Sequence, residues 1–180
     1  ALALVPGDAA GQLQATARNF PGLREHLARL PMHLTAEVGG MRIGIVHGDA
    51  ESLAGWGFAH DALAAPRSAA RLARWFVESG VRIFASSHTC LPALREFEFS
   101  SGRSVVVNNG AAGMPNFSGT CFGLITRIGR RPAPAGTALY GSVIDDVYVD
   151  ALRLEYDHDA WAEQFLANWP VGSAAHASYF

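Results

Sequence analysis

In the stretch MRIGIVHGD, residues 41–49, an apolar run rich in β-branched side chains ends in a histidine. The run follows Gly39 and Gly40, a pair that is typical of a tight turn between two strands. A short apolar run bounded by turn residues predicts a buried β-strand. We therefore expect His47 at the carboxyl end of this strand.

Two more apolar runs end in the same way. They are RIFASSHTC, residues 82–90, which delivers His88 and Cys90 onto a loop, and VVVNNG, residues 105–110, which ends in Asn108, Asn109 and Gly110. In open α/β sheets, ligands bind at the carboxyl ends of strands, because the loops there converge while the sheet holds them rigid. Three polar loops at three such ends predict one shared site.

The side chains in these loops are of types that bind metal ions. Imidazole and thiolate are ligands that zinc and softer divalent ions accept. On an extended segment, residues two apart point the same way, so His88 and Cys90 are both expected to face a metal site. Taken singly, each has an ordinary alternative, since a loop histidine can serve as a hydrogen-bonding group and a cysteine as an apolar filler.

In order and spacing, these blocks resemble the calcineurin-like metallophosphoesterases. Residues 46–49, VHGD, are similar to that family's isolated histidine block, and residues 87–90, SHTC, to its Gly-His-x-His block. Residues 108–111, NNGA, are similar to its Asn-Pro-Gly-Ser turn, and Asp8 lies where its Gly-Asn-His-Asp/Glu block has Asn. The family's first two blocks, Asp-x-His and Gly-Asp, are not found upstream, so we expect a chain that lacks the first strands of its domain.

The resemblance implies an α/β fold, a two-sheet sandwich flanked by helices. It also implies hydrolysis of a phosphate mono- or diester by a metal-activated hydroxide. Two divalent ions, manganese, zinc or iron, are expected in the complete domain. By the same resemblance Asp8, His47 and His88 bind one ion and Cys90 the other, so this chain carries only part of a dinuclear site.

Further positions are expected to contact the substrate or support the ligands. Asn108, Asn109 and Gly110 follow the third strand, and Trp56 lies between two glycines in the loop after His47. An exposed indole there would contact the substrate, although a tryptophan that caps a hydrophobic edge fits the sequence equally well. Asp49 is expected either to accept a hydrogen bond from a ligand histidine or to act as a turn residue.

Other functions stay open at this point. A catalytically inactive metal-binding or scaffolding relative of the same fold would have the same blocks. A cysteine hydrolase with Cys90 as nucleophile and His47 as base is less favoured, because the spacing around Cys90 is unlike a nucleophile elbow. The sequence assigns no catalytic residue beyond the metal ligands.

Composition limits the class of protein. The chain has 180 residues, 49% of them hydrophobic, which suffices for one sizeable core. With a net charge of -2 and no basic stripe, nucleic-acid binding is not expected, and no apolar run approaches the roughly 20 residues that cross a bilayer. Two cysteines do not make a disulfide framework, which favours a reducing compartment, the cytoplasm. The expected partner is a small phosphoester.

Periodicity predicts the remaining elements. Helices are expected over residues 11–19, 23–30, 66–79 and 157–169, and strands over residues 33–38, 93–99, 104–108, 121–128, 138–144 and 147–156. We expect a single metallophosphoesterase-like domain over residues 1–170, followed by a tail over residues 171–180.

Overall fold

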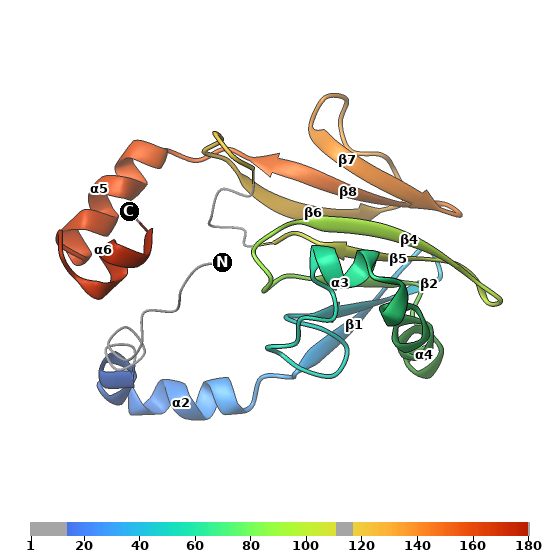
Figure 1. Ribbon diagram of the computed structural model, residues 1–180, viewed down its shortest axis with the longest axis horizontal. Coiled ribbons are helices and arrows are strands. Elements are labelled where there is room, and N and C mark those ends of the chain that lie inside the picture. Colours follow the sequence, from blue (N-terminus) through green and yellow to red (C-terminus); the bar gives the residue numbers. More distant parts are fainter. Residues whose placement is uncertain (1–13, 111–116, 180) are drawn as a thin grey trace. The chain divides into compact units, whose positions relative to one another are not determined.

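The computed structural model describes residues 14–110 and 117–179. The chain divides into two compact units, of which one draws on Ala1–Pro31 and Asp157–Phe180 and the other is Met32–Tyr156. The second unit contains both β-sheets and the three loops that carry the candidate ligands (Figure 1). The predicted domain limit at residue 170 and the expected lack of first strands stay predictions.

The larger sheet has five strands in the order β1-β2-β3-β5-β4. They are β1 (His33–Val38), β2 (Met41–Val46), β3 (Ile83–Ser86), β4 (Ala93–Phe99) and β5 (Gly102–Asn108). β3 pairs in parallel with both β2 and β5, whereas the outer pairs are antiparallel. Because β2, β3 and β5 run in one direction, their carboxyl ends share one edge of the sheet.

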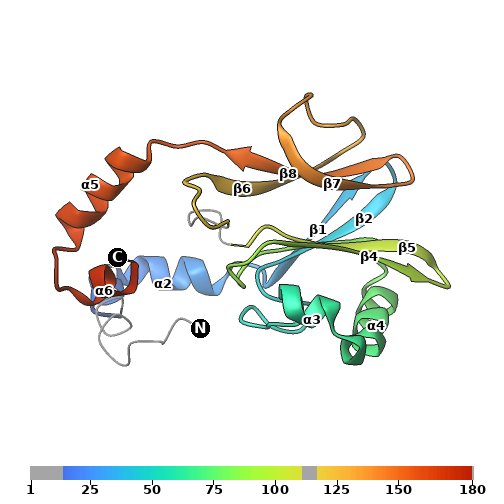
Figure 2. The same ribbon diagram turned by 45° about the horizontal axis from the view of Figure 1, so that its top comes forward.

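The smaller sheet is antiparallel, with β6 (Gly123–Gly129), β7 (Ala138–Ile144) and β8 (Val147–Leu154) in the order β6-β8-β7. Figure 2 shows it as a layer over the larger sheet. An apolar core lies between the two sheets, formed by Met41, Ile43, Ile83, Val105, Val107, Ile144, Val147 and Val149. The central strands of the larger sheet are buried on this face and also on the opposite face, which explains the continuous apolar runs from which they were predicted.

Helices cover the other face of the larger sheet. They are α3 (His60–Ala64), the 3-10 turn Pro66–Ser68 and α4 (Ala69–Ser79). In α4 the spacing of Leu72, Trp75 and Phe76 places all three on one buried face, and Gly80 ends the helix in the left-handed conformation, with a φ of 63°. The predicted fold class, an α/β two-sheet sandwich flanked by helices, is confirmed.

The other unit is helical where the structure describes it. It contains α2 (Pro21–Ala28), α5 (His158–Asn168) and α6 (Ala174–Tyr179). α5 begins after Asp157, whose carboxylate accepts a hydrogen bond from the backbone N–H of Ala160 at 2.9 Å, a normal N-cap. Among the described residues, no helix combines the length and the apolar character that a membrane span requires.

Candidate metal site

Two histidines meet where neighbouring parallel strands end. His47 follows β2 and His88 follows β3, and their ring centroids lie 5.0 Å apart at an interplanar angle of 59°. The backbone N–H of Ser87 donates to the carbonyl oxygen of His47 at 3.0 Å, which ties the two loops together. A zinc ion lies about 2.0–2.1 Å from an imidazole nitrogen, so two rings at this separation are close enough to bind the same ion.

The loop that carries His88 has an unusual backbone. His88 and Cys90 both have left-handed φ values, 72° and 62°. Between them Thr89 donates its N–H to the Ser87 carbonyl at 2.9 Å and accepts that of Leu91 at 2.7 Å. Left-handed non-glycine residues are strained and persist where the surroundings impose them. The strain therefore points to groups that hold this loop in place.

Asn108 is the group that holds it. Its side chain is completely buried, with 0% exposure, and its amide nitrogen donates to the Phe58 carbonyl at 3.0 Å and to the Thr89 hydroxyl at 2.7 Å. Its amide oxygen accepts the N–H of Gly110 at 2.8 Å. Both ends of the amide are thus engaged within the protein. This geometry favours a positioning role over the direct substrate contact expected from the sequence.

Asn109 and Gly110 join the end of β5 to its neighbours. The Asn109 N–H donates to the Ser86 carbonyl at 3.1 Å, and the Ser87 hydroxyl donates to the Gly110 carbonyl at 2.7 Å. The Asn109 amide nitrogen lies 3.4 Å from the carbonyl of Leu124, while its amide oxygen is buried and has no hydrogen-bond partner among the described residues. Asn109 and Gly110 thus lie at the predicted edge, beside the strand that leads to His88.

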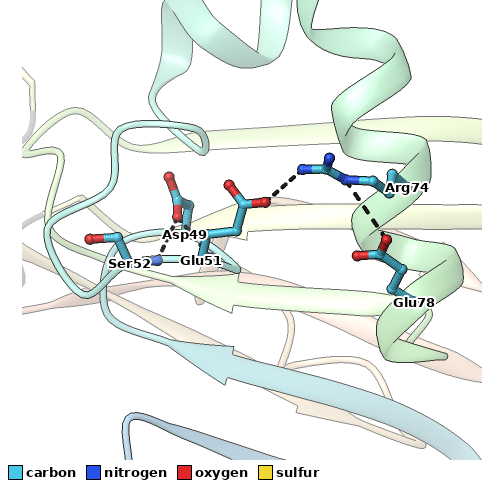
Figure 3. A network of polar contacts seen from close by, with 5 residues as sticks. All are labelled: Asp49, Glu51, Ser52, Arg74 and Glu78. Atoms are coloured by element: carbon cyan, nitrogen blue, oxygen red, sulfur yellow. Dashed lines mark hydrogen bonds and ion pairs between the residues drawn. The ribbon is translucent and has the colours of Figure 1, made fainter.

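Asp49 organises the loop that follows His47. Its carboxylate accepts the backbone N–H groups of Glu51 at 3.0 Å and Ser52 at 2.9 Å (Figure 3) and, further along the loop, that of Gly57 at 2.9 Å. A Cβ at Gly55 would overlap this carboxylate, so the loop is wrapped closely around it. Of the two roles expected for Asp49, these contacts favour the turn residue.

The same loop presents Trp56 to the site. The indole is 61% exposed, and its centroid lies 5.6 Å from that of His88 in an edge-to-face arrangement. The loop is also tied to α4, because Arg74 donates to the Glu51 carboxylate at 2.6 Å and pairs with Glu78 at 3.9 Å (Figure 3). Nothing in the spacing of the sequence connects residues 51 and 74, so this tie was missed.

Of the remaining predicted ligands, Cys90 alone lies among the described residues. Cys90 is exposed, and its thiol lies 3.9 Å from the carbonyl of its neighbour His88. Asp8 lies outside the described residues. Within residues 14–110 and 117–179, no group of three or more histidine, cysteine, aspartate or glutamate side chains is placed to bind a metal ion. The two imidazoles fit one ion in kind and distance, but catalytic zinc usually has three protein ligands.

Comparisons with known proteins support the fold. No family model and no curated protein matches the chain. Among solved structures, the hypothetical protein PH1004 from Pyrococcus horikoshii has a TM-score of 0.51 at 19% identity, over 84% of this chain and 51% of that one. Similar structures with lower scores include a predicted phosphoesterase from Streptococcus pneumoniae (0.38, 18% identity, 72% and 59% covered) and zinc-complexed Vps29 from Entamoeba histolytica (0.35, 16%, 71% and 63%).

The chain spans about half the length of the Pyrococcus protein, 51%. At 19% identity, the similarity to the Pyrococcus protein shows the fold and nothing of the chemistry. The predicted fold is therefore supported, and the resemblance to metallophosphoesterases stays a prediction.

Proposed function

We propose that this chain is part of a metal-dependent phosphoesterase, in which His47 and His88 bind a divalent metal ion and the substrate is a phosphate mono- or diester. The observation that carries the proposal is the approach of the two imidazoles, 5.0 Å between centroids, at the carboxyl ends of adjacent parallel strands. Histidine rings held this way on rigid strand ends suit metal binding better than they suit packing, because neither ring lies in the buried core.

The described residues have distinct tasks in this function. A divalent ion, when bound, supplies an activated water and stabilises charge on the phosphoryl oxygens. His47 and His88 hold the ion, and Asn108 holds the His88 loop by its bond to Thr89. In keeping with the resemblance, Asp8 is the proposed third ligand and Cys90 a proposed ligand of the second ion, whose further ligands come from outside the described residues.

A second function is favoured by one observation. The described residues bring together two metal-binding side chains and no third. A catalytically inactive metal-binding or scaffolding relative of the same fold would need no more than this. It differs from the phosphoesterase in one measurable respect, since it binds metal without hydrolysing phosphoesters.

The proposed location is the cytoplasm. Cys90 and Cys121 are both free and exposed, a state that a reducing compartment preserves. The proposed partner is a small phosphoester.

The proposal is tested by measuring metal content and hydrolysis on the same samples. Bound manganese, zinc and iron are measured by plasma mass spectrometry for the wild type, His47→Ala and His88→Ala, with His26→Ala in α2 as the matched control. We expect both site variants to lose the ion and the control to keep it. Hydrolysis of an aryl phosphate and an aryl phosphodiester is then followed after addition of manganese or zinc.

The outcomes separate the candidate functions. Metal-dependent hydrolysis that both site variants lose supports the phosphoesterase, and bound metal without hydrolysis supports the scaffold. Retention of metal in both variants contradicts the site itself. Hydrolysis abolished by thiol alkylation while the metal stays bound would revive the cysteine hydrolase.

A further inference from the structure

Trp56 combines two properties that seldom occur together. It is 61% exposed, yet it lies between two glycines that are closely packed against Asp49 and Trp75. The neighbouring aromatic residue, Phe58, is the one that fills the core, with 0% exposure and its ring 5.3 Å from that of Trp75. Since Phe58 already fills the apolar interior, Trp56 has no packing role on that side.

Steric contacts fix the loop on both sides of Trp56. A Cβ at Gly55 would collide with the Asp49 carboxylate, and a Cβ at Gly57 would collide with the ring of Trp75. The Gly57 N–H is bound to Asp49, and the Trp56 carbonyl accepts the N–H of Ala59 at 3.1 Å. The backbone on both sides of the indole is therefore held in place, which lowers the entropy lost when a ligand packs on the indole.

Trp56 lies beside the candidate metal site. The indole meets the His88 ring at 5.6 Å and an interplanar angle of 68°, and His88 in turn lies 5.0 Å from His47. A phosphoryl group bound at the histidine pair has its organic group within reach of the indole. Aromatic rings pair with centroids about 4.5–7 Å apart, so a ring joined to the phosphoryl group through one or two atoms can stack there.

We infer that Trp56 is a specificity-determining residue that selects phosphoesters with an aromatic organic group close to the phosphorus. The inference rests on the proposed function, because the phosphoryl group has to bind at the histidine pair. An aromatic pair contributes about 0.5–1.5 kcal/mol beyond the area it buries, and a saturated ring of similar size lacks this term. The expected preference is thus about 2- to 13-fold in affinity.

The test uses two phosphonates that cannot be hydrolysed, benzylphosphonate and cyclohexylmethylphosphonate. They match in size and charge and differ in aromaticity, and binding to the zinc-loaded full chain is measured by calorimetry, independently of turnover. We expect the wild type to bind the benzyl compound about 2- to 13-fold more tightly. Trp56→Ala should abolish this preference and Trp56→Phe should retain it. Trp161→Ala, which removes an exposed indole from α5, is the matched control and should behave as the wild type.

The results distinguish failure of the inference from failure of the function. Equal affinity for the two phosphonates in the wild type, or a preference that survives in Trp56→Ala, overturns the inference. The proposed function still stands in that case if binding needs zinc and is lost in His88→Ala. If neither phosphonate binds in a zinc-dependent way, the function fails and the inference fails with it.

Discussion

At the scale of single residues, the strained backbone beside His88 gives a direct test of the site's construction. Cys90 has a φ of 62° although it carries a side chain, whereas Cys121 has no positive φ. A side chain in the left-handed region costs about 1–2 kcal/mol. Glycine removes that cost but loses about 0.5–1 kcal/mol of its own on folding.

We therefore predict that Cys90→Gly raises the free energy of unfolding by about 0.5–1 kcal/mol. Cys121→Gly, an exposed cysteine without the strain, should lower it by a similar amount. Urea denaturation of both variants measures the difference. A loss of stability in both would mean that the loop does not impose the strain on Cys90.

The second prediction at this scale concerns Asn108. Replacing it by alanine removes three hydrogen bonds at a fully buried position and leaves the Phe58 carbonyl and the Gly110 N–H without their partner. An unsatisfied buried polar group costs about 1–3 kcal/mol, so Asn108→Ala should lower stability by about 3 kcal/mol. Asn168→Ala, at the exposed end of α5, should change it by less than about 0.5 kcal/mol. Equal urea midpoints for Asn108→Ala and Asn168→Ala would show that Asn108 does not hold the loops around Phe58, Thr89 and Gly110.

At the scale of elements, the loop over residues 48–57 depends on glycines that have no room for a side chain. Gly57→Ala places a Cβ against Trp75 and the Asp49 carboxylate. Overpacking of this kind costs about 1–3 kcal/mol. We predict that Gly57→Ala lowers the free energy of unfolding by about 1–3 kcal/mol. The tryptophan fluorescence should also change, because Trp56 and Trp75 both move.

The control for this prediction is Gly22→Ala. Gly22 lies in α2, and no atom lies within 4 Å of the place that a Cβ would occupy there. Alanine at this position should be neutral or should stabilise the helix by up to about 1 kcal/mol. Urea unfolding curves for Gly57→Ala and Gly22→Ala measure the difference in stability. Similar stability of the two would contradict the close packing of the loop around Asp49.

At the scale of the whole molecule, Glu96 links the two sheets of the sandwich. From β4 it accepts hydrogen bonds from the Ser142 hydroxyl of β7 at 2.7 Å and from Arg103 of β5 at 2.6 Å. The bond from Ser142 is the main cause that lowers the pKa of the Glu96 carboxyl, followed by the bond from Arg103. A lowered pKa means that the folded state favours the ionised form.

The pH dependence follows from that direction. The stabilisation is present above the ordinary glutamate pKa of 4.5 and is lost as the pH falls through the lower folded value. Because the pair with Arg103 is 46% exposed on both sides, the effect stays below about 1 kcal/mol. Glu96→Gln should therefore lower stability near neutral pH and flatten its decline in acid.

Urea midpoints over a pH series measure this effect, with Glu37→Gln, an exposed position in β1, as the control. The control should follow the wild type throughout. If Glu96→Gln also follows the wild type, the link between the sheets contributes no stability.

Sequence alone determined the elements that have a strong local signal. β-branched apolar runs gave β2, β3 and β5 to within a few residues, and the spacing of Leu72, Trp75 and Phe76 gave α4, although the structure begins the α-helix at Ala69 after a 3-10 turn. The positions of His47 and His88 after their strands were determined in the same way. α3 was missed, because five residues are too few to show a helical period.

Which side chains meet depends on the packing of the whole chain and could not be predicted from the sequence. The alternation that predicted a shared direction for His88 and Cys90 holds for extended backbone, whereas both residues are left-handed in a turning loop. The hydrogen bonds of the Asn108 amide and the ion pair between Glu51 and Arg74 join residues from different segments of the chain. The bond from the Gly57 N–H to the Asp49 carboxylate joins distant positions of one loop. Local sequence sets backbone preference, but the partner of a polar side chain is set by whatever the packed sheets and helices bring beside it.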